Sequence, residues 1–248
     1  MIGLPAIPPA LAAALLALAV AALALAPLAL SDYGISLLIN VVSYWILTAS
    51  WAMFSGPTRY VSLATSAFFG VGAYLVAMLV NALPLHVIFG VAAVAGLGVA
   101  LVVGLSTLRI SGMYFVIFTF GLSELIRELS IWWEINQTKT LGRYVFTDFT
   151  GVLIYEHLLA LAVVVGVTGW AIHRSRLGFA LRVIGDDEGV ARQVGINVAA
   201  VKVAVFGISA LFMTVTGAIM APRYSYIDPN IAFNPLISFQ VVIMALLG

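Results

Sequence analysis

Long apolar runs alternate with short polar stretches along almost the whole chain. Runs of about 20 apolar residues, enough for a helix to cross a hydrocarbon core about 30 Å thick, lie at about 10–30, 35–54, 60–81, 84–106, 112–133, 152–172 and 199–221. A further run, 236–248, reaches only about 20 Å at about 1.5 Å per residue, so we expect the chain to stop in mid-span. The pattern predicts an all-α, polytopic membrane protein with about seven to eight transmembrane segments.

The first apolar run fits two interpretations. An Ala24-Leu25-Ala26 tripeptide resembles a signal-peptidase site. However, no Lys or Arg precedes the run, and its length matches a full crossing rather than a signal core. We therefore interpret residues 10–30 as a retained first span. The second run is expected to end in a turn at residues 55–59, where Ser, Gly and Pro precede Arg59.

Small residues mark three of the predicted spans. The run 60–81 is rich in small and hydroxyl residues, which indicates either close helix approach or a broken helix whose freed backbone groups face a pathway. The runs 84–106 and 199–221 carry small residues at helical spacing, which predicts packing seams. These are Ala92, Gly96, Ala100 and Gly104 in the first, and Gly207, Ala210, Thr214, Gly217 and Ala218 in the second.

The least hydrophobic stretch, residues 174–198, lies between two apolar runs and reads RSRLGFALRVIGDDEGVARQVGINV. Its first half places four apolar residues at i, i+3, i+4 and i+7, which predicts one face of a short helix. They are Leu177, Ala180, Leu181 and Ile184.

A second short helix is predicted in the other half of this stretch. Gly185 is expected to break the first helix, Asp186 or Asp187 to cap the second, and Gly195 to end it in a left-handed conformation. Val190, Ala191 and Val194 share one side of it. Two amphipathic helices between spans need a partner for their apolar faces, which is either the lipid headgroup region or a soluble protein.

Composition agrees with an integral membrane protein. Hydrophobic residues make up 63% of the chain, charged residues 8%, and the mean hydropathy is +1.16. A net charge of +1 argues against nucleic acid as a partner. Cysteine is absent, His86, His157 and His173 lie far apart, and neither Lys139 nor Lys202 stands in a phosphate-loop motif. We therefore expect no metal, no cofactor and no enzymatic activity in this chain.

The run 112–133 is unusual because it carries ionisable residues. Glu124, Arg127 and Glu128 fall on one helical face by the i, i+3, i+4 rule. Such groups are costly within the membrane unless they are paired or hydrated. Two interpretations stay open: an ion pair that fixes the depth of the helix, or a lining of the substrate path.

The basic residues predict the orientation of the chain. If the loop at 174–198 is cytoplasmic, the inner side receives Arg59, Arg109, Arg174, Arg176, Arg182, Arg192 and Lys202. Lys139, Arg143 and Arg223 then lie outside, with Arg127 near the outer end of its helix. This arrangement places the N-terminus in the cytoplasm and the loop 134–151 on the outer side.

Four stretches carry a family resemblance. They are SAFFGVGAY at 66–74, LRISGMYFVIFTFGLSELIRE at 108–128, SRLGFALRVIGDDEGVARQVGINVAAVKVAVFGISALFMTVTGAIMA at 175–221, and YIDPNIAFNPLISFQVVIMALLG at 226–248. In this order they resemble the permease subunits of branched-chain amino acid ABC importers. The resemblance implies a single membrane permease domain over residues 1–248, in the inner membrane of a bacterium.

The resemblance also implies partners and sites. A second, homologous permease would pair with the chain, ATPase subunits would bind and hydrolyse ATP, and a periplasmic binding protein would deliver substrate. The residues implied to contact the ATPase are Gly178, Ala180, Leu181, Arg182, Ile184, Glu188, Gly195, Ile196 and Asn197. A zwitterionic amino acid needs an acceptor for its ammonium and a donor for its carboxylate. The path candidates are therefore Tyr114, Thr119, Glu124 and Arg127.

The sequence departs from the family pattern at Phe179, Gly185 and Arg192, which changes the charge presented to the ATPase, and in the stretch 136–142. The substrate is therefore open among branched-chain amino acids, urea, short amides and other amino acids. Two rival hypotheses remain: a channel or carrier that needs no ATPase, and a membrane-embedded enzyme using Glu124 or Asp148.

Overall fold

The computed structural model describes residues 9–107, 110, 112–137, 139–147 and 149–248, so the expectations for Arg109 and Asp148 lie outside the described residues. Seven helices of 15 residues or more dominate the described chain. They are α1 (Pro9–Ala29), α2 (Asp32–Thr58), α3 (Thr65–Leu79), α4 (Leu85–Thr107), α5 (Met113–Gln137), α6 (Gly151–Arg174) and α9 (Val198–Met220).

Shorter elements connect or follow these helices. They are β1 (Arg143–Tyr144), α7 (Arg176–Asp186), α8 (Glu188–Gln193), a 3-10 turn η1 (Ala221–Arg223), β2 (Tyr226–Ile227), α10 (Pro229–Ala232) and α11 (Pro235–Leu247). The all-α prediction therefore needs one small correction, since β1 and β2 form an antiparallel pair that joins Arg143 to Ile227. This pair ties the loop after α5 to the segment after α9.

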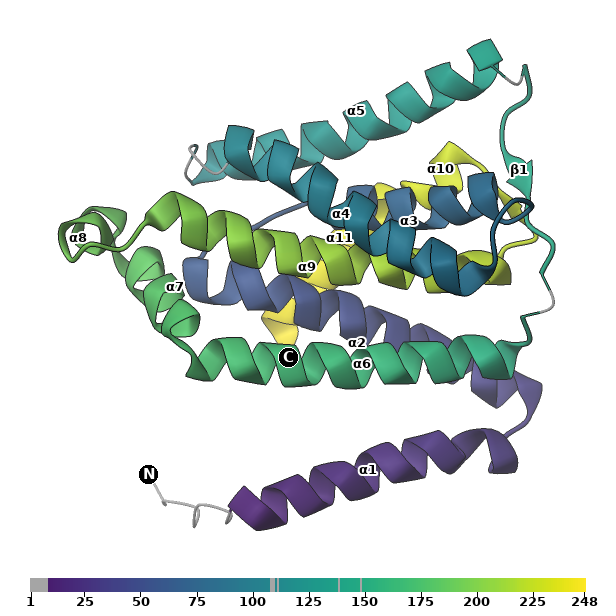
Figure 1. The fold of residues 1–248 in the computed structure, drawn as a ribbon, viewed down its shortest axis with the longest axis horizontal. Helices are drawn as coiled ribbons and strands as arrows, with labels where there is room; N and C mark the ends of the chain where they lie inside the picture. The colour runs from purple at the N-terminus through teal and green to yellow at the C-terminus, as the bar shows by residue number, and fades with distance from the viewer. Residues whose placement is uncertain (1–8, 108–109, 111, 138, 148) are drawn as a thin grey trace.

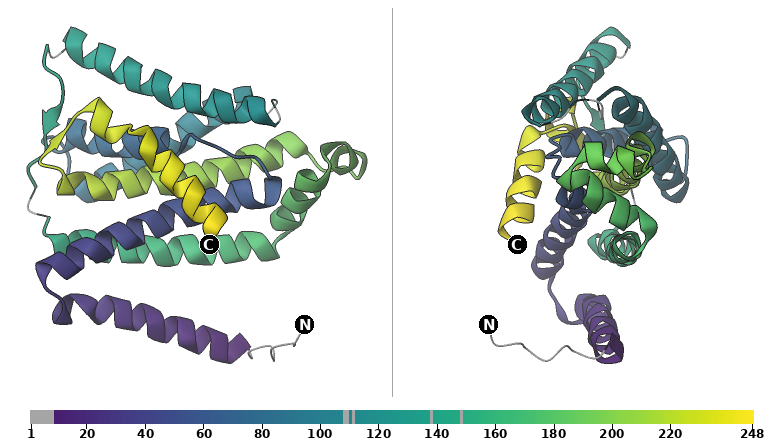
Figure 2. Two further views of the ribbon diagram at one scale, coloured as in Figure 1. Left: turned by 180° about the vertical axis from the view of Figure 1, so that it is seen from behind. Right: turned by 90° about the vertical axis from the view of Figure 1, so that its left-hand side faces the viewer.

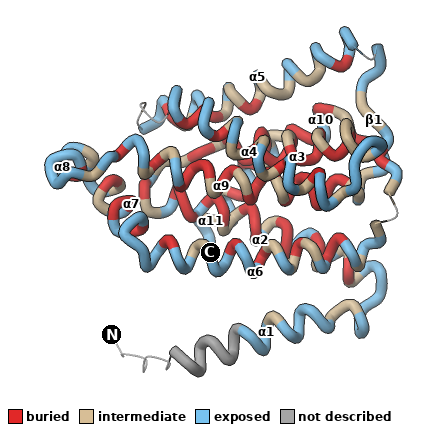
Figure 3. Tube along the Cα trace, in the orientation of Figure 1, coloured by how far each residue is buried: buried red, intermediate tan, exposed pale blue. Residues whose placement is uncertain are grey.

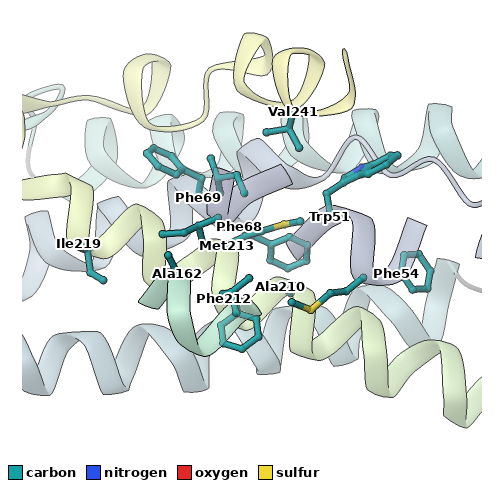
Figure 4. Packing of buried hydrophobic residues seen from close by; sticks show 14 of the residues in the cluster. Trp51, Phe54, Phe68, Phe69, Ala162, Ala210, Phe212, Met213, Ile219 and Val241 are labelled. Carbon is teal, nitrogen blue, oxygen red and sulfur yellow. The ribbon is translucent and has the colours of Figure 1, made fainter. Parts of the chain in front are cut away.

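Helix α9 occupies the centre of the bundle (Figure 1). It packs against α3 and α4 on one side and against α2 and α6 on the other. Helix α5 lies along one edge and α1 along the opposite edge, where Tyr155 Oη donates to Leu23 O at 2.8 Å (Figure 2). Buried positions concentrate on α2, α3 and α9, where aromatic and aliphatic side chains such as Phe68 and Met213 interlock (Figures 3 and 4).

Small residues allow the central helices to approach closely. A Cβ added at Gly72 would lie 1.8 Å from Thr214 O, and one at Gly217 would lie 2.0 Å from Phe69 O. On α4, Gly96 faces Thr214 in the same way. The predicted packing seams on 84–106 and 199–221 are thus confirmed, because the small residues of α4 and α9 are buried where the two helices meet.

The third predicted span is broken. Residues 59–64 are not helical and α3 begins only at Thr65, so the apolar run 60–81 is not one continuous helix. Hydroxyl side chains bind the freed backbone groups: Thr119 accepts from Leu63 N at 3.1 Å, and Ser123 and Ser238 donate to Leu63 O at 3.2 and 2.9 Å. Both sequence interpretations hold in part: Gly72 allows a close helix approach, and the start of the segment is not helical. Hydroxyls of α5 and α11 satisfy the freed backbone groups of Leu63, and a pathway along them stays a prediction.

Helix α2 runs further than the sequence predicted. Residues 55–58, expected as a turn, form its last helical residues, and the left-handed Arg59 (φ 59°) ends it. Pro57 lies in this last turn and has no N–H to donate to the helix, which agrees with the helix ending after Thr58.

Five helical stretches in the described chain are long and apolar enough to cross a membrane. They are Asp32–Thr58, Leu85–Thr107, Gly151–Arg174, Val198–Arg223 and Pro229–Leu247. Helix α3 and the stretch Ala17–Ala29 are apolar but shorter. The protein is therefore a polytopic helical membrane protein.

Candidate functional site

Helices α7 and α8 project from one end of the bundle (Figure 1). Ser175 caps α7 by accepting from Leu177 N and Gly178 N at 3.1 and 3.4 Å. Asp187 caps α8 by accepting from Gly189 N and Val190 N at 2.6 and 3.1 Å. The predicted helix–turn–helix, with an aspartate cap for its second helix, is confirmed. We call residues 174–198 the coupling loop.

Two glycines seat α7 against the bundle. A Cβ at Gly178 would lie 2.3 Å from Ile172 O of α6, and one at Gly185 would lie 2.0 Å from Pro57 O of α2. The predicted break at Gly185 is correct to within one residue, because α7 ends at Asp186. Gly185 also lets the helix touch the backbone of α2. Gly195 does adopt the left-handed conformation, with φ of +83°.

We expect Gly185→Ala to displace α7 and to lower the melting temperature of the protein. A methyl group at this position overlaps a backbone carbonyl that cannot rotate away, and overpacking of this kind costs about 1–3 kcal/mol. Thermal unfolding in detergent measures the change. Gly56→Ala is the matched control, since nothing lies within 4 Å of its Cβ and alanine suits a helix better than glycine. Equal melting temperatures for the two variants would contradict the close contact.

The coupling loop has an inner and an outer face. Gly178, Ala180, Leu181 and Ile184 are buried against the bundle, whereas Arg182, Gly195 and Asn197 are exposed and Glu188 and Ile196 are half-buried. Asn197 also caps α9 by accepting from Ala200 N at 3.1 Å. Leu177, predicted for the inner face, is exposed.

The outer face carries apolar residues that no part of the described chain covers. Phe179 is 60% exposed, Val190 49% and Val194 64%. Exposed apolar side chains at this end of the bundle can be covered by a partner or by the lipid headgroup region. The sequence pattern placed Val190, Ala191 and Val194 on one side of the second helix, which was wrong for Ala191, because that residue is fully buried while the two valines are exposed. Phe179 was not singled out by the pattern as an exposed apolar residue.

A charged cluster locks α8 to α9. The ammonium of Lys202, whose residue is 0% exposed, pairs with Glu188 Oε1, which also accepts from the hydroxyl of Tyr60. Arg192 Nη2 lies 3.0 Å from Glu188 Oε2, and Lys202 Nζ lies 4.0 Å above the ring of Tyr60. One carboxylate thereby joins the coupling loop, the N-terminal part of α9 and the segment after α2.

The environment lowers the pKa of the Glu188 carboxyl below its ordinary value. Partial burial acts in the opposite direction, but hydrogen bonds from Lys202 and Tyr60 and the charges of Lys202 and Arg192 outweigh it. Glu188 is therefore ionised at neutral pH.

The second group of predicted residues lies on α5. Arg127 Nη2 pairs with Glu124 Oε2 at 2.7 Å and with Glu128 Oε1 at 3.0 Å, and its Nη1 donates to Asn230 Oδ1 of α10 at 3.2 Å. Among the described residues, Glu124 Oε1 and Arg127 Nε are buried without a hydrogen-bond partner. An acceptor and a donor thus lie next to each other with bonding capacity to spare.

The structure does not gather all four path candidates. Thr119 is fully buried and bonds the broken segment before α3, while Tyr114 is 76% exposed near the start of α5. Only Glu124 and Arg127 are in contact. Asn230, their partner on α10, was not among the sequence candidates.

Residues 33–248 match the model of the branched-chain amino acid transport system permease component. The chain belongs to this permease family. It is a family of transport proteins rather than enzymes, and it accounts for the polytopic helical architecture.

Two curated relatives are similar to the chain. The high-affinity branched-chain amino acid transport system permease proteins LivM of Escherichia coli (strain K12) and of Salmonella typhimurium are each 25% identical to it over 239 residues, which include 83% of this chain and 56% of each relative. The chain thus spans about half the length of the curated relatives it matches. No solved structure matches the chain significantly.

Proposed function

We propose that this chain is a transmembrane permease subunit of an ABC importer that moves branched-chain amino acids from the periplasm to the cytoplasm. The observation that carries the proposal is the coupling loop: two capped helices, seated on the bundle by glycine contacts and joined to α9 by Glu188, with an uncovered apolar outer face. Membership in the permease family supports it. With α1, α3 and α5 added to the five long apolar stretches, about seven to eight spans form one permease domain over residues 1–248.

The coupling loop faces the cytoplasm of a bacterial inner membrane in this proposal. Arg59 and the basic residues of the loop lie at one end of the molecule, where Arg59 pairs with Asp186 at 2.8 Å. Arg143 and Arg223 lie near β1 and β2 at the other end. The larger number of basic residues marks the cytoplasmic end, which also places the N-terminus there.

The partners follow from this orientation. ATPase subunits, which bind the ATP, dock on Phe179, Val190 and Val194 and on the exposed parts of the predicted contact set. The buried members of that set transmit the motion to α2, α6 and α9, and closure of the ATPases rocks these helices as rigid bodies. A second, homologous permease completes the path, and a periplasmic binding protein delivers substrate at the end that carries β1 and β2.

Glu124 and Arg127 are the proposed substrate contacts. The unpaired oxygen of Glu124 suits an ammonium group and the unpaired Nε–H of Arg127 suits a carboxylate, so together they fit a zwitterion. Tyr114 and Thr119 lie on the same helix and border the path at its cytoplasmic half. Urea, short amides and other amino acids remain alternative cargoes of the same architecture.

We expect Phe179→Asp to reduce the amount of ATPase that copurifies with the tagged chain from native membranes in mild detergent. A charge at the centre of an apolar contact must be desolvated on docking, which costs several-fold in affinity at the least. Phe146→Asp is the matched control, because Phe146 is 76% exposed at the opposite end of the molecule. Mass spectrometry quantifies the recovered subunits.

Three outcomes separate the proposal from its rivals. Recovery of a phosphate-loop ATPase that falls with Phe179→Asp and not with Phe146→Asp supports the importer. Recovery of the chain as a stable homo-oligomer with transport activity and no ATPase favours the channel or carrier. Equal recovery with both variants would place the ATPase contact elsewhere on the loop.

A further inference from the structure

An apolar groove of about 520 Å³ lies between α2, α6 and α7. Its walls include Trp45 and Met53 of α2, Val165 and Trp170 of α6, and Leu181 of α7. None of the described residues that line it is acidic, and its titratable members are His173 and Arg182. His173 and Arg182 lie at the end of the groove that is next to α7.

The length of the groove matches one leaflet of a bilayer. Along α2 it runs from Trp45, near the middle of the helix, to Pro57 in the last turn. At about 1.5 Å per residue this is about 18 Å, slightly more than half of a hydrocarbon core about 30 Å thick. The groove therefore extends from mid-membrane to the level of the headgroups on the side of the coupling loop.

Basic side chains surround the headgroup end. Arg182 Nη1 donates to His173 O at 3.4 Å, and the guanidinium of Arg174 lies 4.7 Å from the centre of the Trp170 ring. The ion pairs among the described residues use neither of these arginines, while the nearby carboxylates are engaged, Asp186 with Arg59 and Glu188 with Lys202. The mouth thus offers positive charge to an external anion.

We propose that this groove binds one anionic phospholipid, with an acyl chain along Trp45, Met53 and Trp170 and the phosphate between Arg174 and Arg182. A free anion would make no contact with the apolar wall, and a neutral lipid would not neutralise two guanidinium groups that form no ion pair among the described residues. Basic pockets between helices at the membrane surface bind anionic headgroups in this way. Assignment to the cytoplasmic leaflet rests on the proposed orientation, but the binding itself does not.

The position of the lipid gives it a mechanical role. It fills the angle between α7 and the α2–α6 pair, where Gly178 and Gly185 bring the backbones into contact. An occupied groove therefore supports the coupling helix from the membrane side. An empty groove leaves the apolar wall to water or to neutral acyl chains.

The test measures quenching of tryptophan fluorescence by lipids with brominated acyl chains. The full chain is placed in phosphatidylcholine vesicles in which either phosphatidylglycerol or part of the phosphatidylcholine is brominated. Trp132→Phe/Trp133→Phe removes the two exposed indoles of α5 and leaves Trp45, Trp51 and Trp170. In this background we expect brominated phosphatidylglycerol to quench several-fold more efficiently than brominated phosphatidylcholine.

Three variants locate the site. Arg174→Gln/Arg182→Gln is expected to lower the preference by about fivefold for each arginine removed. Ala52→Phe, which fills the groove from an exposed position on its wall, is expected to lower it with all charges retained. Arg176→Gln removes an exposed arginine that does not line the groove and is expected to retain the preference.

Each other result overturns the proposal. Equal quenching by both lipids in the unmodified background means that no anionic lipid is selected. A preference that survives Arg174→Gln/Arg182→Gln places the anion elsewhere. Loss in that variant together with retention in Ala52→Phe shows attraction to the basic loop surface and no groove site. Because quenching needs neither ATPase nor transport, failure here is distinct from failure of the importer proposal.

Discussion

Replacing Lys202 with methionine is expected to destabilise the protein by about 3 kcal/mol and to detach α8 from α9. Removal of one partner from a buried ion pair costs about 3–5 kcal/mol, because the other charge is left without compensation. The lower end applies here, since the Glu188 side chain is 24% exposed and keeps Arg192 and Tyr60 as partners. The side chain of Lys202 is only 1% exposed. Methionine is chosen because it is unbranched and of similar length but carries no charge.

A double-mutant cycle measures this interaction. Unfolding in mixed micelles gives the free energy for Lys202→Met, for Glu188→Gln and for the double variant, and we expect the double variant to recover most of the loss. Arg192→Met is the matched control: its side chain is 66% exposed in its pair with the same carboxylate, so its loss should cost less than about 1 kcal/mol. Additive effects of the two single changes would show that Lys202 and Glu188 act independently.

The same ion pair between Glu188 and Lys202 predicts that the stability of the fold depends on pH. The pKa of the Glu188 carboxyl is lowered in the folded protein from an ordinary value of 4.5, so its contribution is present above pH 4.5 and is lost as the pH falls through the folded value. Stability of the original chain should therefore decline more steeply below pH 4.5 than that of the Glu188→Gln/Lys202→Met variant. Equal slopes would mean that Glu188 gains no stability from its ionised form.

The coupling loop illustrates how far the sequence pattern reaches. Local signals were sufficient for its two helices. Asp187 caps the adjacent helix α8, and Gly195 adopts the left-handed conformation just after it. Contacts between distant segments were not visible in the pattern. Tyr60 lies 128 residues before Glu188, whereas Lys202 follows it by 14 residues but on the next long helix. The sequence analysis used Lys202 only to predict orientation and to exclude a phosphate loop. A lysine in the N-terminal part of an otherwise apolar span was the one available signal.

The segment before α3 shows what a local pattern cannot predict. Composition left open whether the helix is continuous from residue 60, and the chain is not helical before Thr65, where hydroxyls from α5 and α11 bind the backbone of Leu63. Those hydroxyls belong to other segments, so no local propensity reports them. Likewise the sequence placed Gly185 at the end of a helix, but its close contact with Pro57 of α2 could be seen only in the structure.

Replacing Arg127 with glutamine is expected to weaken substrate uptake by about ten- to a hundredfold, mainly through a higher KM. A hydrogen bond to a charged group is worth about 1.5–3 kcal/mol, and glutamine cannot present a charge to a substrate carboxylate. Arg127 also holds Glu124 and Asn230, so its loss disturbs the acceptor beside it. Uptake of radiolabelled leucine into vesicles that contain the whole importer measures both kinetic constants.

Two comparisons separate a substrate contact from an ion pair that fixes the depth of α5. Arg127→Lys keeps the charge and should restore part of the affinity, whereas it cannot bridge Glu124 and Asn230 as a guanidinium does. Arg223→Gln is the matched control, because Arg223 also binds an asparagine, Asn40 at 3.0 Å, at the same end of the molecule. If Arg127→Gln lowers thermal stability but leaves KM unchanged, Arg127 only positions α5, and the substrate path must lie along other residues.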